Sequence, residues 1–220
     1  MEQRVKSFKY SVKIESSYFA AGTYFSVRNP EHELRVKALI QKLTGLPVVC
    51  GHELAQSLGA YERGVTAYLN AQLLPVAEGL IKTVASEIEG RDLNPKISML
   101  RCDGSVVSMH EAMKKPIESV FSGPAASLLG ASYLSGYETC TVIDVGGTST
   151  DVSLIHKELP YLSETGAVVG GWQTKVRALR METSAMGGGS HIWVQSGNIS
   201  IGPRRVISPS AEQQSCIQIL

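Results

Sequence analysis

The 220-residue sequence lacks a long apolar run and an excess of charge of either sign. No apolar stretch approaches the roughly 20 residues that a membrane-spanning helix needs, so we expect no membrane association. A formal net charge of +1 provides no field that would attract nucleic acid or an anionic bilayer, so we expect no nucleic-acid partner. The first residues also lack the apolar core of a signal peptide.

Cysteine is scarce and dispersed, and no C-x-x-C pair occurs among the four residues Cys50, Cys102, Cys140 and Cys216. The first three lie in apolar runs, which predicts buried free thiols rather than disulfides or zinc ligands. We therefore expect a reduced, cytoplasmic protein.

The most informative segment that is present is Asp144-Val-Gly-Gly-Thr-Ser-Thr-Asp151. Apolar residues precede and follow it, a pattern that predicts a strand, a tight turn and a second strand. Two adjacent glycines let backbone N–H groups approach an anion, because no Cβ blocks the way. The segment therefore predicts a nucleotide phosphate site, with the binding residues Gly146, Gly147, Thr148, Ser149, Thr150 and Asp151.

The two aspartates at the ends of this segment suit different roles. Asp144, at the end of a strand, is predicted to lie over the γ-phosphate of ATP, where it would hold Mg²⁺ through water or orient an attacking water. It is thus both the catalytic and the metal-binding candidate. Asp151 is predicted to fix the turn by accepting backbone N–H bonds. The alternative is a structural hairpin, since Gly-Gly and Asp are ordinary turn residues.

Two further segments could contact phosphate. Ser122 and Gly123 stand at a predicted helix start, whose free N–H groups attract anions, although the spacing alone favours a simple N-cap followed by a first-turn proline. Gly187, Gly188, Gly189 and Ser190 form either a backbone concavity beside the nucleotide or a flexible link to the next hairpin. The residues themselves leave both alternatives open.

The N-terminal part of the chain predicts strand, helix and strand, as in an α/β sheet. Residues 8–27 read as extended, with a buried strand at 22–27. A helix capped by Asn29 and ended by Gly45 follows, and a strand spans 46–50. A long helix over 61–88 should be kinked or split by Pro75, and a boundary falls at 91–95.

The C-terminal part predicts shorter elements. A strand over 97–102 turns at Asp103-Gly104 and returns, and Ser108 with Glu111 predicts a capping box. A helix from Ser122 is predicted to end at Gly136, ahead of the glycine-rich turn. A last hairpin is predicted for residues 192–201.

Taken together, several blocks in this order resemble the hydantoinase A/5-oxoprolinase family, which also includes β-type subunits of acetone carboxylase. The blocks are Asn29-Pro-Glu-His-Glu33, Tyr61-Glu-Arg63, Leu69-Asn70, Ser122-Gly-Pro-Ala-Ala126, Asp144–Asp151, Gly187-Gly-Gly-Ser190 and Gly202-Pro203. The combination is specific, although any single block is not.

The resemblance implies an α/β, actin-like ATPase fold of two ribonuclease-H-like halves, with ATP and Mg²⁺ between them. It implies an enzyme that uses ATP to activate a carbonyl, so that a hydantoin- or 5-oxoproline-type cyclic amide is opened or a ketone is carboxylated. It also implies a small-molecule cyclic amide or ketone substrate, a second, hydantoinase B-type subunit and an oligomer.

Two departures from the family pattern predict that the chain is a fragment. The family's first Asp-x-Gly-Gly-Thr-Phe-Thr-Asp loop is absent, and the sequence after Arg204 does not follow the family. We expect residues 1–92 to be a remnant of the first half with its connecting helix, and residues 93–220 to be a truncated second half. Alternatives are a non-catalytic regulatory or subunit-docking module and, with less support, a relative of sugar kinases or chaperones.

Overall fold

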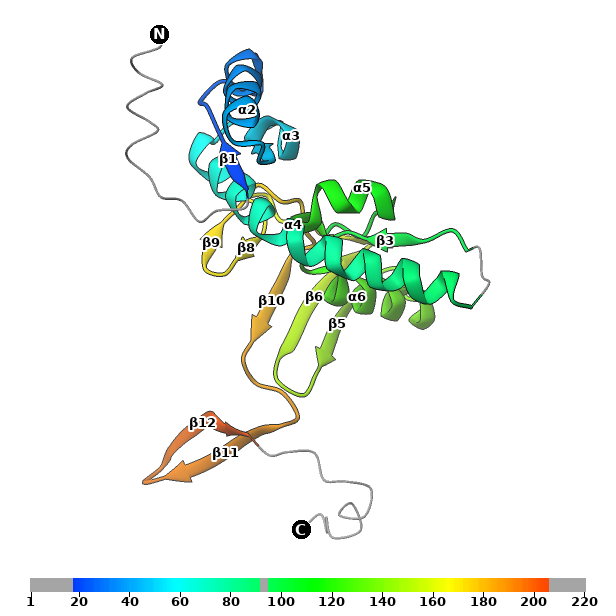
Figure 1. Ribbon diagram of the computed structural model, residues 1–220. Helices are drawn as coiled ribbons and strands as arrows, with labels where there is room; N and C mark the ends of the chain where they lie inside the picture. Colours follow the sequence, from blue (N-terminus) through cyan, green and yellow to red (C-terminus); the bar gives the residue numbers. More distant parts are fainter. Residues whose placement is uncertain (1–17, 92–94, 206–220) are drawn as a thin grey trace. The chain divides into compact units, whose positions relative to one another are not determined.

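The computed structural model describes residues 18–91 and 95–205. These divide into two compact units (Figure 1), one within Met1–Met99, Val106–Val120 and Glu164–Arg177 and the other within Leu100–Ser105, Phe121–Ser163 and Ala178–Leu220. Each unit has its own buried apolar residues, so each is described separately below.

The first unit is built on a short parallel pair of strands. Strands β1 (Phe19–Ala21) and β2 (Val48–Cys50) pair in register, and α2 (Glu31–Thr44) connects them. Ala21, Val48 and Cys50 form a buried cluster against Ile40 of α2. A parallel pair requires such a crossover, which explains why the helix lies between the strands in sequence.

Helix α4 (Ala60–Glu89) is the longest element and follows the one-turn helix α3 (Gly51–Leu54). Its first half packs on β2 through Ala67 and Ala71, which are buried against Val49. Pro75 lies inside the helix, which continues as a single element. Pro75 is exposed, and the split of the helix that its missing N–H predicted does not occur.

The second unit contains an antiparallel sheet in the order β10-β6-β5, with β7 also paired to β6. Its strands are β5 (Cys140–Val145), β6 (Thr150–His156), β7 (Leu159–Pro160) and β10 (Met181–Ser184). Helix α6 (Ser122–Ser135) covers one face through Ala125 and Leu128. On the other face Ile143, Val145 and Leu154 are exposed. That exposed apolar face is where a further protein segment could pack.

The remaining elements are short. They are β3 (Ser98–Leu100), β4 (Val106–Ser108), α5 (Met109–Lys114), the 3₁₀ helix η1 (Pro116–Ser119), β8 (Val168–Val169), β9 (Trp172–Gln173), β11 (Ser190–Gln195) and β12 (Asn198–Arg205). Three two-stranded pairings join β3 with β4, β8 with β9, and β11 with β12.

Most elements predicted from the sequence are confirmed. Gly45 and Gly136 end their helices with φ of 71° and 68°, and the Ser108 side chain accepts the N–H of Glu111. Cys50 and Cys102 are buried free thiols, and Cys140 is free and half-buried. Cys216 and the expected extended residues 8–17 lie outside the described residues.

Three local predictions are wrong. Residues 22–27 form turns rather than a strand, because polar contacts to buried charges hold them there. Helix α2 has Pro30 at its N-cap, while the Asn29 side chain accepts the N–H of Glu31 from outside the helix. Helix α6 begins at Ser122, whose side chain makes no cap, because the preceding residue Phe121 occupies the N-cap.

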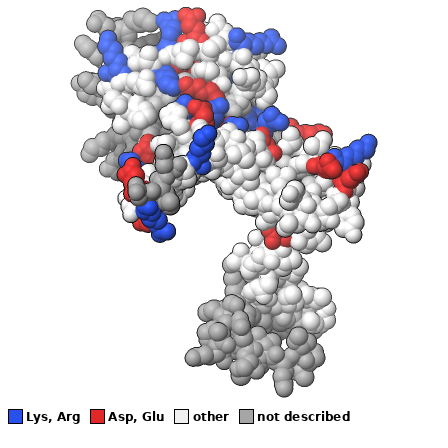
Figure 2. Space-filling view, turned by 90° about the vertical axis from the view of Figure 1, so that its right-hand side faces the viewer, with Lys and Arg blue, Asp and Glu red and all other residues white. Residues whose placement is uncertain are grey.

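On the face shown in Figure 2, lysine and arginine side chains lie beside aspartate and glutamate side chains, and neither sign forms a large patch. This view fits the near-zero net charge of the sequence. Among the described residues, no helix is long and apolar enough to span a bilayer.

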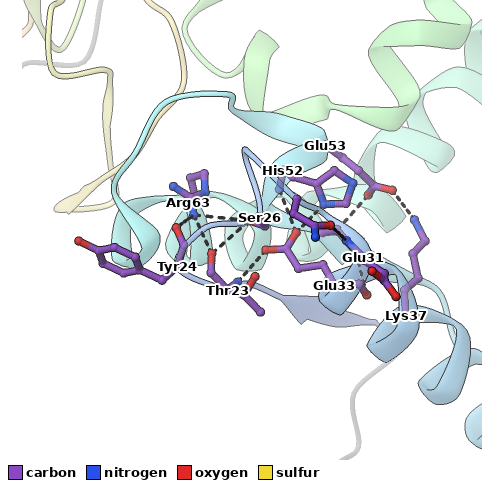
Figure 3. Close-up of polar contacts among 11 residues, drawn as sticks. Thr23, Tyr24, Ser26, Glu31, Glu33, Lys37, His52, Glu53 and Arg63 are labelled. Carbon is purple, nitrogen blue, oxygen red and sulfur yellow. Dashed lines mark hydrogen bonds and ion pairs between the residues drawn. The ribbon is translucent and has the colours of Figure 1, made fainter.

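A network of buried polar groups fixes the turn at residues 22–28 in the first unit (Figure 3). Arg63 of α4 is only 1% exposed. Its guanidinium donates to the carbonyls of Ser57 at 2.9 Å, Thr23 at 2.7 Å and Tyr24 at 2.8 Å. Glu33 of α2 is fully buried and accepts the N–H of Thr23 at 2.7 Å. The turn is therefore held from two helices at once.

Replacing Arg63 tests how much this network contributes to the stability of the chain. Arg63→Met should lower the free energy of unfolding by about 3–5 kcal/mol, because it removes charge-assisted bonds and leaves buried carbonyls unpaired. Arg91→Met, which removes only an exposed contact to Glu87, should change it by less than about 0.5 kcal/mol. Urea unfolding measures the free energy of unfolding of both variants. Equal losses would show that the buried Arg63 network contributes no more to stability than an exposed ion pair.

Candidate functional site

The glycine-rich turn joins β5 to β6 in the second unit. Asp144 pairs with Asp151 and Val145 with Thr150, so the turn itself is residues 146–149. The N–H of Gly146 donates to the carbonyl of Ser149 at 2.9 Å and closes it. The predicted strand, turn and strand are confirmed.

A second glycine segment lies directly on this turn. The N–H of Gly188 donates to the carbonyl of Gly146, and the N–H of Gly189 donates to the carbonyl of Gly147, each at 2.8 Å. The segment is not a flexible link, because Ser190 also accepts the N–H of Gly187 through its hydroxyl at 3.0 Å. Two sequence blocks 40 residues apart thus form one backbone assembly.

Gly187 has no room for a side chain. A Cβ there would lie 2.5 Å from the carbonyl oxygen of Gly146 and 2.7 Å from the nitrogen of Thr148. Such distances are far inside van der Waals contact, so the close approach of the two segments requires glycine. At Gly147, by contrast, a Cβ would meet nothing within 4 Å.

In this assembly of the two glycine segments, the carbonyl acceptors are hydrogen-bonded and several N–H donors are not. The carbonyls of Gly146 and Gly147 are both bonded, whereas the N–H groups of Gly147, Thr148 and Ser149 donate no hydrogen bond within residues 18–91 and 95–205. Thr148 and Gly147 are exposed. Free N–H groups on an exposed glycine turn are the donors that an anionic phosphate oxygen needs.

The hydroxyl groups of the turn divide into two kinds. Thr150 donates to the carbonyl of Met186 at 2.6 Å, so its hydroxyl holds the neighbouring segment. The hydroxyls of Thr148 and Ser149 have no hydrogen-bond partner in the described part of the chain. The latter two are the hydroxyls left to contact a ligand.

Asp144 and Asp151 lie directly opposite each other on one face of the sheet. Like charges in such a pair repel, because their Cβ atoms are about 5 Å apart. Asp151 accepts the Thr183 hydroxyl of β10 at 2.6 Å, so it ties the turn to a neighbouring strand rather than to backbone N–H groups as predicted. Asp144 is half-buried, and its carboxylate makes no hydrogen bond or ion pair to the described residues. A divalent cation at Asp144 would relieve the repulsion and fits this oxygen donor set.

Ser122 and Gly123 start α6, a 14-residue helix that packs on the same sheet. A Cβ at Gly123 would meet nothing within 4 Å. Within the described residues no hydrogen bond joins this pair to the glycine turn. The helix start is confirmed, and its predicted contact with a nucleotide stays a prediction.

Comparison with known proteins gives a family match. The model of the hydantoinase/oxoprolinase family matches residues 63–211, a range that includes the whole glycine assembly. The chain belongs to the hydantoinase/oxoprolinase family.

Individual relatives agree with this assignment. The chain is 30% identical to the acetophenone carboxylase gamma subunit of Aromatoleum aromaticum over 82% of its length, and 29% identical to the 5-oxoprolinase of Dictyostelium discoideum over 80%. Among solved structures, it resembles the ATP-dependent caprolactamase from Pseudomonas jessenii with a TM-score of 0.74 and 25% identity over 93% of its length.

The chain covers only part of each of these proteins. It spans 26% of the carboxylase subunit, 15% of the oxoprolinase and 30% of the caprolactamase chain. The comparisons therefore show the family of this chain, whereas the activities named for these proteins belong to their whole chains.

Sequence reasoning missed a second polar cluster, around Glu33. The His52 ring nitrogen Nδ1 lies 2.5 Å from the Glu33 carboxylate, and the Cys50 thiol donates to the Glu33 carbonyl at 3.8 Å. Glu33 lies in the first turn of α2, where an acidic residue ordinarily stays exposed near the helix dipole, so the local pattern gives no sign of its burial. Three potential metal ligands, on Glu33, Cys50 and His52, lie within 4.8 Å of one another. They already bond to one another and to backbone, so packing accounts for them.

The pKa values in this cluster follow from burial and hydrogen bonding. Burial by itself would raise the pKa of Glu33, but hydrogen bonds from Ser26, His52 and Thr23 outweigh it and lower that pKa. Burial, with the nearby Glu53 carboxylate, raises the pKa of the Cys50 thiol to about 11. The thiol therefore stays protonated and unreactive at neutral pH.

Gly187 has no space for a Cβ and Gly147 has space, so substitutions at these two glycines distinguish their roles. Gly187→Ala should lift the 187–189 segment off the turn and abolish protection of the Gly188 and Gly189 amides in hydrogen exchange, because its Cβ overlaps backbone. Gly147→Ala has space and should leave that protection intact. Equal protection in both variants would contradict the close approach.

Glu33 should make the stability of the chain fall at acidic pH. Its folded pKa is lowered from 4.5, so its contribution is fully present above the unfolded pKa and is lost as the pH falls through the folded pKa. Glu33→Gln should therefore reduce stability at pH 7 and flatten the decline below about pH 5 in urea unfolding series. Glu111→Gln, at an exposed ion pair, is the control and should leave that decline steep.

Proposed function

We propose that this chain provides a phosphate-binding turn of an ATP-dependent enzyme that opens a cyclic amide. The observation that supports this proposal is the contact between the two glycine segments. It bonds the carbonyls of Gly146 and Gly147 and leaves three consecutive N–H groups without a partner among the described residues. Such donors suit the β- and γ-phosphates of ATP.

The proposed roles of the individual residues follow from their partners. Gly147, Thr148 and Ser149 would contact phosphate oxygens, while Thr150, Asp151, Gly187, Gly188, Gly189 and Ser190 would maintain the shape of the site. Asp144 would hold Mg²⁺, which neutralises charge on the phosphates. Ser122 and Gly123 would add a helix N-terminus to the same nucleotide.

ATP is needed because an amide carbonyl is a poor electrophile. Transfer of the γ-phosphoryl group to the carbonyl oxygen releases ADP and leaves a carbon that water attacks readily. Cleavage of the ring C–N bond in this adduct expels the amine and leaves an acyl phosphate, which a second water hydrolyses to the open acid and phosphate. Asp144, in contact with the reacting phosphate or its cation, would be the catalytic residue from this chain.

The names of the relatives support this class of reaction. One is a 5-oxoprolinase and another an ATP-dependent caprolactamase, and both names denote action on cyclic amides. The name acetophenone carboxylase gamma subunit makes ketone carboxylation the second candidate, since it also requires an activated carbonyl.

The fold to which this chain belongs, its partners and its location are also proposals. We propose an actin-like ATPase fold in which residues 1–92 and 93–220 belong to its two ribonuclease-H-like halves. The exposed residues Ile143, Val145 and Leu154 support contact with further protein, such as a second subunit or another copy. The cytoplasm remains the proposed location.

Nuclear magnetic resonance of this chain tests the proposal directly. Titration with Mg-ATP should shift the amide signals of Gly147, Thr148 and Ser149 selectively, with a weak, roughly millimolar affinity because one turn supplies few of the required bonds. Shifts located elsewhere, or none at the turn, would overturn the assignment.

Asp144→Asn provides the matched variant. It should remove the Mg²⁺ dependence of those shifts and raise the free energy of unfolding by about 0.5–1 kcal/mol, because it relieves the repulsion from Asp151. A non-catalytic module predicts the opposite: an Asp144 variant that binds Mg-ATP as the natural chain does.

A further inference from the structure

Strand β5 forms one edge of the sheet in the second unit, because the strand order is β10-β6-β5 (Figure 1). On the side away from β6, no strand within residues 18–91 and 95–205 pairs with it. An edge strand presents unpaired N–H and C=O groups, which natural sheets protect with lysine, proline or a bulge. Strand β5 contains no lysine or proline, and its register with β6 is regular throughout. This edge is therefore open to pairing.

The hydrogen bond that closes the glycine turn determines which residues face the open edge. The N–H of Gly146 donates to the carbonyl of Ser149. Hydrogen-bonded pairs alternate along an antiparallel ladder, so the even-numbered residues of β5 bond to β6. The backbone N–H and C=O groups of Thr141, Ile143 and Val145 consequently point outward, toward the open edge.

The side chains of the same three residues lie on the exposed face of the sheet. Ile143 is 61% exposed and Val145 is 62% exposed, and Thr141 is exposed as well. Helix α6 covers only the opposite face. A strand added at this edge would therefore satisfy the outward backbone groups and shield two aliphatic side chains from water at the same time.

The edge of β5 is complementary to a second copy of itself. In an antiparallel pairing centred on Ile143, this residue lies opposite its own copy, and Thr141 lies opposite Val145. All three residues face outward, and each such pair exchanges two backbone hydrogen bonds, about six in total. The two-fold axis through Ile143 makes both copies contribute the same surface, which is how most closed dimers form.

The only charged residue of β5, Asp144, selects this register. With Ile143 at the centre, Asp144 lies opposite Val142 of the second copy. A pairing centred on Asp144 would place the two carboxylates directly opposite each other, and like charges in that position repel. A pairing centred on Val142 would place Val145 opposite Thr139, which lies outside the strand. The register about Ile143 avoids both costs.

We propose that two copies of this chain pair through the open edge of β5, antiparallel about Ile143, and form one continuous sheet. Its strand order is β10-β6-β5 in one copy, continued by β5-β6-β10 in the other. The glycine turn at residues 146–149 lies beyond the paired residues, so the contact leaves it accessible. This interface goes beyond the proposed function and does not depend on it.

Sedimentation equilibrium of the full 220-residue chain tests the proposal with two matched variants. The chain should form dimers with a roughly micromolar dissociation constant. Ile143→Lys should weaken the dimer at least about tenfold, because the two lysines would face each other across the axis. Leu154→Lys, on the same face but in the inner strand β6, should associate as the natural chain does.

Other occupants of this surface give different results. A chain that stays monomeric at about 100 μM overturns the proposal. Equal weakening by both lysine variants would assign the contact to packing on the sheet face, and no weakening by either would assign it to another surface. Either result overturns the pairing of β5 edges.

Nuclear magnetic resonance checks the register itself. In a mixture of labelled and unlabelled chains, the Hα atoms of Val142 and Asp144 should show a contact between copies, because Cα atoms opposite each other at such positions are about 4.5 Å apart. Hydrogen-exchange protection of the Ile143 amide should rise with chain concentration. Protection that is already complete in the monomer would assign the edge to a segment of the same chain and would overturn the proposal.

Discussion

The close approach of two glycine backbone segments is the constraint on which the proposed phosphate site depends. Gly187 comes so close to Gly146 that no Cβ fits between them. That contact lets Gly188 and Gly189 bond the carbonyls of the turn, and the remaining N–H groups stay available. A protein that must present donors to an anion gains from this arrangement, because the acceptors that would repel the anion are already occupied.

The first unit depends on a different kind of interaction. Arg63 and Glu33 are buried charges, and both bond the backbone of Thr23 in the turn at residues 22–28. Glu33 is also bonded by His52, and Arg63 also donates to the carbonyls of Tyr24 and Ser57. Buried charges need such partners, so the network specifies the path of that turn closely.

Local chemistry explains which elements could be predicted. Gly45 and Gly136 end helices because glycine adopts the left-handed conformation without strain, and Ser108 caps a helix because its hydroxyl accepts a nearby N–H. These interactions span at most four residues. Residues 22–27 were predicted as a strand from their apolar side chains, whereas bonds from residues 10 to 40 positions away hold them as turns.

The amino-acid sequence by itself determined the family and the glycine-rich turn between two strands, and it predicts which residues contact a phosphate, because these follow from composition and from motifs in a given order. Tertiary structure alone decided that Gly187–Gly189 lies on Gly146 and Gly147, and that Asp151 bonds Thr183. The physical reason is distance along the chain: contacts between residues tens of positions apart depend on the packing of whole elements, which no local pattern encodes.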